Sequence, residues 1–223
     1  MPDDNVIHFV PRPPGGDPED RQPFIKLPGF TKYFALLLLG IHILLSAVSE
    51  PTRFWVFEHF GLTPAYYGGA LPFDWPAIIG PLTFTFIHGN WTHLIMNTVM
   101  LVAFGAGLEP WMGWKRLAFL MFLCNCAAVI LQVAFDPGST NPVIGASGAL
   151  SGLFAAAIIM LQDRSGAAMG KYGYWPMIVI WVGASIAFGV IGGPNGESIA
   201  WQAHIGGFLT GFALYKPVMK LWR

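Results

Sequence analysis

Long apolar segments recur along this chain, and they constrain its fold more than any other feature. Six of them, each of roughly 16 to 22 residues, have the length that a helix needs to cross about 30 Å of hydrocarbon. Of the 223 residues, 54% are hydrophobic and only 11% are charged, whereas ordinary soluble domains carry about a quarter charged residues. The sequence therefore predicts an all-α, polytopic bundle of six transmembrane helices. We place the spans at about 33–49, 92–108, 116–135, 147–162, 175–192 and 199–215.

The positions of lysine and arginine predict how this bundle is oriented. If the N-terminus is cytoplasmic, every lysine and arginine except Arg53 falls in a cytoplasmic segment, and such segments are enriched in these residues in membrane proteins. We therefore predict that both termini are cytoplasmic. Residues 1–28, which are rich in Pro, Gly and charge, are predicted to be a disordered cytoplasmic tail, and residues 29–223 to form the membrane domain.

The segment 50–91, which follows the first predicted span, is too long to be a simple connection. It is rich in aromatic residues and poor in charge, as is typical of segments at the interface between lipid headgroups and acyl chains. We predict that this outer loop is partly embedded in the membrane. A belt of aromatic residues that only anchors the bundle is the alternative interpretation.

Polar side chains inside a membrane span are costly and by default indicate a functional site. In the predicted topology Asn97, Ser147 and His204 fall in the outer parts of three different helices, and His93 lies one turn before Asn97. This layer of polar groups indicates chemistry near the outer surface of the bundle. His42, alone in the first span, is interpreted as a buried core residue.

Two pairs of glycines predict how the helices that carry Ser147 and His204 meet, because small residues in GxxxG spacing let helix backbones approach closely. Packing of these faces would bring a hydroxyl within hydrogen-bond reach of an imidazole, which activates a serine nucleophile. The cores of the spans contain no Asp or Glu, so a Ser-His dyad is simpler than a triad. Asn97 and His93 could donate N–H groups to an oxyanion, with structural hydrogen bonds as the alternative. The glycine pairs are Gly148 with Gly152, and Gly207 with Gly211.

Three motifs, taken in order, resemble those of the rhomboid intramembrane proteases, and the resemblance covers most of the chain after residue 80. It implies that Ser147 is the nucleophile and His204 the general base. It also implies that His93 and Asn97 stabilise the oxyanion and that His88 anchors the outer loop. The motifs are His88-Gly89-Asn90-Trp91-Thr92-His93-Leu94-Ile95-Met96-Asn97, Gly145-Ala146-Ser147-Gly148, and Ala203-His204-Ile205-Gly206-Gly207 with Gly211.

Two positions depart from the pattern of that family. Rhomboids often carry a Trp-Arg pair in the first outer loop, where this chain has Arg53-Phe54-Trp55. Many also have an aromatic residue four positions after the nucleophile, where this chain has Ser151. We therefore expect another contact to orient His204, and Ser151 to hydrogen-bond near the site or to offer a rival hydroxyl.

The expected function is that of a serine endopeptidase that hydrolyses peptide bonds in or near the transmembrane segments of other membrane proteins. The expected partners are those transmembrane substrates and the lipid bilayer, and the expected location is a bacterial cytoplasmic membrane. The alternative is a rhomboid-like protein that binds or escorts membrane proteins without cutting them. Such inactive proteins are expected to lack the serine or the histidine.

Other classes of protein have less support in the sequence. A metal site at His88 and His93 has no Cys, Asp or Glu nearby, and no metal, nucleotide or other cofactor is implied. A transporter would be expected to carry paired polar sites on two symmetric halves. The formal net charge is zero and no basic cluster is present, which argues against a nucleic-acid partner.

Overall fold

The computed structural model describes residues 27–165, 172–192 and 199–222, and these residues are mainly helical. Within these ranges there is no β-strand, and Leu62 and Val143 form an isolated antiparallel bridge. The predicted all-α class is therefore confirmed. Most of the predicted N-terminal tail, residues 1–26, lies outside the described residues.

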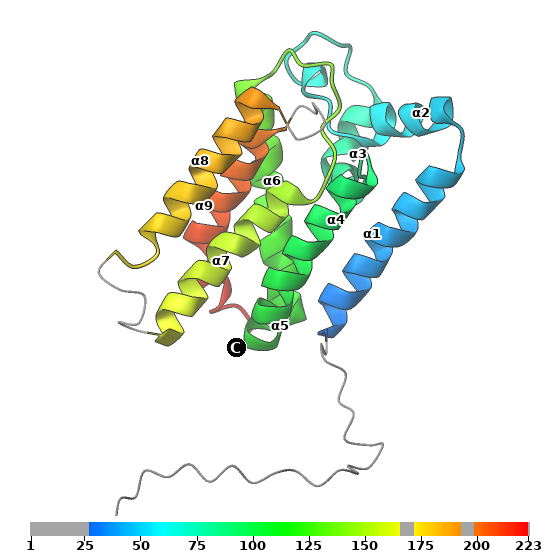
Figure 1. The fold of residues 1–223 in the computed structure, drawn as a ribbon. Helices are drawn as coiled ribbons and strands as arrows, with labels where there is room; N and C mark the ends of the chain where they lie inside the picture. Colours follow the sequence, from blue (N-terminus) through cyan, green and yellow to red (C-terminus); the bar gives the residue numbers. More distant parts are fainter. Residues whose placement is uncertain (1–26, 166–171, 193–198, 223) are drawn as a thin grey trace, which may run out of the picture.

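A helix occupies each of the six positions predicted for a span, and Figure 1 shows these helices side by side. Three helical segments, Gly29–Ala47, Trp91–Met112 and Trp114–Phe135, are long and apolar enough to cross a membrane. The chain is therefore a helical membrane protein, whereas the total of six spans and their orientation stay predictions. The helices are α1 (Gly29–Ala47), α4 (Trp91–Met100) continued by η4 (Leu101–Gly105) and α5 (Ala106–Met112), α6 (Trp114–Phe135), α7 (Ser147–Ser165), α8 (Trp175–Ile191) and α9 (Trp201–Val218).

The segment 50–91 folds into short helices, which Figure 1 shows at one end of the bundle beside α1 and α4. Ser49 and Asp74 accept hydrogen bonds from the first backbone N–H groups of two of these helices and so define where they begin. Several of the aromatic side chains are exposed, among them Trp55 and Trp75. Embedding of this segment in the membrane stays a prediction. The short helices are α2 (Glu50–Phe60), η2 (Pro64–Tyr66), α3 (Trp75–Thr83) and η3 (Phe84–Phe86).

Helices α6, α7 and α9 pack closely against one another in the middle of the bundle. Helix α7 is covered by its neighbours along most of its length, and Leu150, Leu153, Ala155 and Ala156 are fully buried. It begins at the predicted residue, Ser147, and ends three residues later than predicted. The predicted nucleophile, Ser147, is thus the first residue of a deeply buried helix.

A buried carboxylate fixes the start of α1. Glu109 in α5 is 7% exposed, and its carboxylate accepts hydrogen bonds of 2.8 Å from the N–H groups of Phe30 and Thr31 and from the Thr31 hydroxyl. These N–H groups belong to the first helical turn, where no intrahelical acceptor exists, and a negative charge is favourable there. Gly105 lets the helices approach, because a Cβ at this position would lie 2.7 Å from the Thr31 hydroxyl. Helix α1 is therefore held directly against α5 at this end.

Candidate active site

The structure brings the side chains of Ser147 and His204 together, although 57 positions separate them in the sequence. Ser147 is the first residue of α7 and His204 lies in the first turn of α9. The Ser147 Oγ and the His204 Nε2 are 2.8 Å apart, which is hydrogen-bond distance. With the imidazole proton on Nδ1, the hydroxyl donates to Nε2. A serine in this contact can lose its proton to the histidine as it attacks a carbonyl carbon.

The glycine pairs explain why α7 and α9 lie so close. A Cβ at Gly207 would overlap the carbonyl of Gly148, and a Cβ at Gly211 would overlap the carbonyl of Gly152. The two helix backbones are therefore in direct contact at both points. Gly148 also lies against α6, because a Cβ there would be 2.7 Å from the Cβ of Ala128. This packing holds the first turns of α7 and α9 at the separation that the Ser147–His204 contact needs.

The segment that precedes Ser147 is held by the outer loop and by a histidine ring. Gly145 has φ +114°, a conformation that favours glycine, and its N–H donates to the carbonyl of Phe84 at 2.9 Å. A Cβ at Gly145 would lie 2.6 Å from the Nε2 of His93. The His93 ring therefore packs directly on the backbone two residues before the candidate nucleophile.

The predicted oxyanion residues lie on α4, and Asn97 is 3% exposed. The Asn97 Nδ2 donates to the carbonyl of His93 at 2.9 Å, and its Oδ1 has no hydrogen-bond partner in the part of the chain that the structure describes. Because an amide nitrogen carries two hydrogens, Nδ2 keeps one donor beyond this contact. Asn90 begins α4 by accepting a 2.8 Å hydrogen bond from the His93 N–H. His93 and Asn97 are thus fixed one turn apart on the same helix.

His88, predicted to anchor the outer loop, lies just before α4 and is 1% exposed. Its ring stands nearly perpendicular to the ring of His93, with 5.1 Å between the ring centroids. Burial lowers the pKa of His88 to about 3, and the nearby imidazoles of His93 and His42 contribute in the same direction. His88 is therefore neutral at physiological pH and packs, near the end of the outer loop, against the ring of His93.

Two polar residues that the sequence analysis weighed lie in other contacts. The hydroxyl of Ser151, which is fully buried, donates to the carbonyl of Ser147 at 2.8 Å, so it bonds to its own helix. His42 is 4% exposed and packs edge-on against Trp91, with 4.6 Å between the ring centroids. Among the described residues, no group of three or more His, Cys, Asp or Glu side chains lies close enough together to hold a metal ion.

Two buried polar residues of α6 are not among the site residues predicted from the sequence. The Asn125 amide donates to the carbonyl of Pro81 at 2.9 Å and so ties α6 to α3. Gln132 is 4% exposed, and its Oε1 has no hydrogen-bond partner within the described residues. Both residues lie inside the span predicted at 116–135. Polar side chains within a span usually have a functional role or a hydrogen-bond partner, and this rule was sufficient to identify both residues from the sequence.

A family model and several known proteins are similar to the part of the chain that carries these residues. A model of the Rhomboid domain matches residues 77–220. RHOMBOID-like protein 4 of Arabidopsis thaliana is 30% identical over 133 residues, which cover 60% of this chain and 32% of that protein. Rhomboid-type serine protease 2 of Emericella nidulans is 26% identical over 165 residues, which cover 72% of this chain and 31% of that protein. This chain thus spans about a third of the length of either relative.

A bacterial relative matches over nearly its whole length. YdcA of Bacillus subtilis, named as a candidate rhomboid protease, is 26% identical over 200 residues, which cover 88% of this chain and 92% of that protein. The Ser147–His204 contact and the helices that make it lie inside the matched domain. Because that domain model covers well over half of the chain, the protein belongs to the rhomboid family.

Proposed function

We propose that this protein is an intramembrane serine endopeptidase that uses a dyad of Ser147 and His204. The observation that carries the proposal is the 2.8 Å contact between Ser147 Oγ and His204 Nε2, made by two helices in direct backbone contact. A partly buried serine bonded to a histidine is the arrangement required for acyl transfer. Membership of a family that acts on membrane proteins within the bilayer supports their transmembrane segments as the substrate class.

The chemistry follows from the positions of the groups. As Ser147 Oγ attacks the scissile carbonyl, its proton passes to His204 Nε2, which then returns the proton to the leaving amine. Water hydrolyses the resulting acyl-enzyme by the same steps with water as the nucleophile. The oxyanion forms beside the first turn of α7, where backbone N–H groups and the positive end of the helix dipole favour negative charge. Asn97 Nδ2 and the His93 ring are the side-chain donors.

Packing of the helices, rather than an aromatic ring, orients His204 in this proposal. The position four residues after the nucleophile holds Ser151, whose hydroxyl is bonded to the carbonyl of Ser147. The ring of His204 is instead fixed by the register of α9 on α7, which the contacts of Gly207 and Gly211 with the α7 backbone determine. Ser151 in this view completes the hydrogen bonding of α7 and takes no part in the reaction.

The proposed topology has six spans with both termini in the cytoplasm, which is the orientation that the positions of lysine and arginine favour. Residues 29–223 then form one membrane domain, residues 1–28 a cytoplasmic tail, and 50–91 an outer loop that lies partly in the membrane. The dyad lies at the outer side of the bundle, so a substrate segment must unwind there to expose its carbonyls. A bacterial cytoplasmic membrane is the proposed location, supported by the near full-length match to YdcA.

The proposal is tested with purified full-length protein in lipid, a fluorophosphonate probe and a panel of single-span membrane proteins. We expect the wild-type protein to be labelled by the probe and to cut at least one member of the panel at a discrete position. Ser147→Ala should abolish labelling, and His204→Ala should lower cleavage by about 10⁴ or more. Ser151→Ala is the matched control and should leave both activities within a few-fold. A folded wild-type protein that is neither labelled nor active would favour a binding protein instead.

A further inference from the structure

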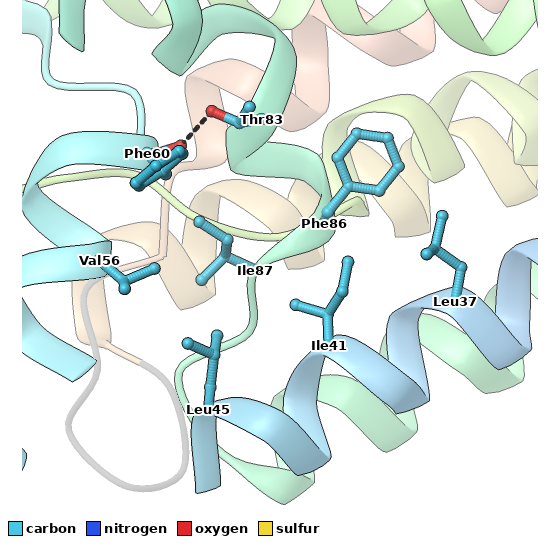
Figure 2. A pocket seen from close by; sticks show the side chains of 8 residues that line it. All are labelled: Leu37, Ile41, Leu45, Val56, Phe60, Thr83, Phe86 and Ile87. Carbon is cyan, nitrogen blue, oxygen red and sulfur yellow. Dashed lines mark hydrogen bonds between the residues drawn. The ribbon is translucent and has the colours of Figure 1, made fainter. Parts of the chain in front are cut away.

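An apolar groove with a volume of about 410 Å³ opens between α1, α2 and the segment that joins α3 to α4. Figure 2 shows Leu37, Ile41 and Leu45 in a row along α1, with Phe86 and Ile87 facing them. These three α1 residues are spaced four apart and so lie on one face of the helix. From the first to the third they cover about 12 Å at 1.5 Å per residue. The groove is therefore long and follows the axis of α1.

The remaining wall of the groove is apolar as well. Val56 and Phe60 of α2 close one end, next to Leu45. Thr83 also lines the groove, but its hydroxyl donates to the carbonyls of Phe60 at 2.7 Å and Ile79 at 3.0 Å, and Figure 2 shows the first of these bonds. The one hydroxyl among the lining side chains is therefore already satisfied. A ligand that fits here must be apolar along the whole of this length.

The lining of the groove favours a thin ligand over a helix. A single row of α1 side chains, one from each turn, runs along its length, whereas a helix with its side chains is roughly 10 Å across. A single extended hydrocarbon chain is much thinner. The groove also lies along α1, which is long and apolar enough to cross a membrane, so acyl chains surround it. The occupant that matches both its shape and its surroundings is an acyl chain.

The face of α2 that lines the groove carries a cation one turn before Val56. Arg53 precedes Val56 by three residues and Phe60 by seven, so the three residues share one face of α2. The guanidinium is 3.7 Å from the carboxylate of Glu50, which is itself 72% exposed. Such an exposed ion pair contributes little, and a guanidinium prefers the bidentate contact that a phosphate offers. The apolar groove and this cation together have the polarity of a phospholipid.

We propose that this groove binds one glycerophospholipid, with an acyl chain along Leu37, Ile41 and Leu45 and the phosphate on Arg53. The bound lipid fills the space between α1 and α2, and so connects the outer loop to the helix that precedes it. An empty groove would leave its apolar lining without contacts on one side, and the acyl chain supplies them. This site is separate from the dyad, and the proposal does not depend on whether the protein cuts substrates.

The acyl part is tested by native mass spectrometry of the full-length protein, first stripped of lipid in detergent and then titrated with phosphatidylglycerol. We expect one tightly retained lipid on the wild-type protein. Ile41→Trp fills the groove and should weaken retention at least about tenfold, because the exclusion of two methylenes already has that effect. Leu44→Trp, on the exposed side of the same helix, is the matched control and should retain the lipid. Equal retention by both variants would overturn the proposal.

The phosphate part is tested with Arg53→Gln and with diacylglycerol of the same chain length. Arg53→Gln should weaken retention of phosphatidylglycerol several-fold and leave the weaker retention of diacylglycerol unchanged, whereas Lys115→Gln should change neither. Equal binding of the two lipids by wild-type protein would refute the role of Arg53.

A third measurement needs no variant that fills the groove. Wild-type protein is irradiated with phosphatidylglycerol that carries a diazirine at the end of one acyl chain. Crosslinks that unlabelled lipid competes away should map near Leu37, the end of the groove farthest from Arg53. Competable crosslinks elsewhere only, or capture of a protein by benzoylphenylalanine at Ile41 in cells, would overturn the lipid assignment.

Discussion

Glu109→Gln tests how far a single buried carboxylate holds α1 in the bundle. The carboxylate accepts three hydrogen bonds of 2.8 Å from the first turn of α1, two from backbone N–H groups and one from the Thr31 hydroxyl. The glutamine has nearly the same shape, but its NH₂ group would face one of these donors, and it brings no charge to the helix N-terminus. The substitution therefore changes the hydrogen bonding and the charge at this position but leaves the packing nearly unchanged.

The expected loss of stability follows from these contacts. A hydrogen bond to a charged group contributes about 1.5 to 3 kcal/mol, and a charge at a partly buried helix terminus adds up to about 2 kcal/mol. With one N–H group left without an acceptor and the charge removed, we expect Glu109→Gln to lower the unfolding free energy by about 2 to 4 kcal/mol. Thr31→Val, which removes the hydroxyl bond alone, should cost about 1.5 to 3 kcal/mol.

The assay is reversible unfolding in mixed micelles of mild detergent and SDS, followed by circular dichroism. Glu58→Gln, at an exposed carboxylate of α2, is the matched control and should change the unfolding free energy by less than about 0.5 kcal/mol. Because Thr31 and Glu109 bond to each other, the double variant should lose less than the sum of the single losses, by about 0.5 kcal/mol or more. Full additivity, or a loss at Glu109 no larger than that of the control, would refute this account of α1.

Three further predictions concern the candidate site and its surroundings. Gly207→Ala introduces a Cβ that overlaps the Gly148 carbonyl and should lower the cleavage rate about 10²-fold, the usual effect of a misplacement near 1 Å. Asn97→Ala removes the proposed oxyanion donor and should lower kcat about 10² to 10³-fold with KM little changed. The pKa of His88 lies near 3 in the folded protein and near 6.5 in the unfolded chain, so the unfolded chain binds more protons between these values. Acidification from pH 7 to pH 5 should therefore lower the unfolding free energy by on the order of 2 kcal/mol.

Each of these three predictions has a control variant or a result that would contradict it. Gly183→Ala places a Cβ on α8 where no atom lies within 4 Å, and it should leave cleavage unchanged. If Gly183→Ala lowered the cleavage rate as much as Gly207→Ala, the effect at Gly207 could not be assigned to the contact between the α7 and α9 backbones. An effect of Asn97→Ala on KM alone would assign the residue to substrate binding. His88→Gln should reduce the loss of unfolding free energy between pH 7 and pH 5 by on the order of 2 kcal/mol, and an unchanged loss would refute the role of His88.

The sequence predicts the helical framework well, because apolar runs of spanning length leave few alternatives. All six predicted positions hold a helix, and α7 begins at the predicted residue, Ser147. The structure also brings Ser147 and His204 within hydrogen-bond distance, although their roles stay proposals. In both cases the information is local: the length of an apolar run, or small residues one helical turn apart beside a polar residue.

Other features depend on contacts that no local pattern contains. Glu109 directly follows the span predicted at 92–108, and its partner, the first turn of α1, lies 79 positions away in sequence. The helices of the segment 50–91 are short, and two of them begin at caps provided by Ser49 and Asp74. The bond of Ser151 to its own helix could have been predicted, because buried serines in helices commonly donate to the carbonyl four residues earlier.

The glycine contacts between α7 and α9 have a consequence for how this protein can change over evolutionary time. At those two points the backbone of α9 contacts the backbone of α7 directly, so no change of side-chain rotamer can alter the distance between the two helices. Residues away from these two points can be exchanged for other apolar residues of similar volume while the hydroxyl and the imidazole keep their separation. Relatives that share only about a quarter of their residues with this chain can therefore keep the same backbone contact, provided that the small residues persist.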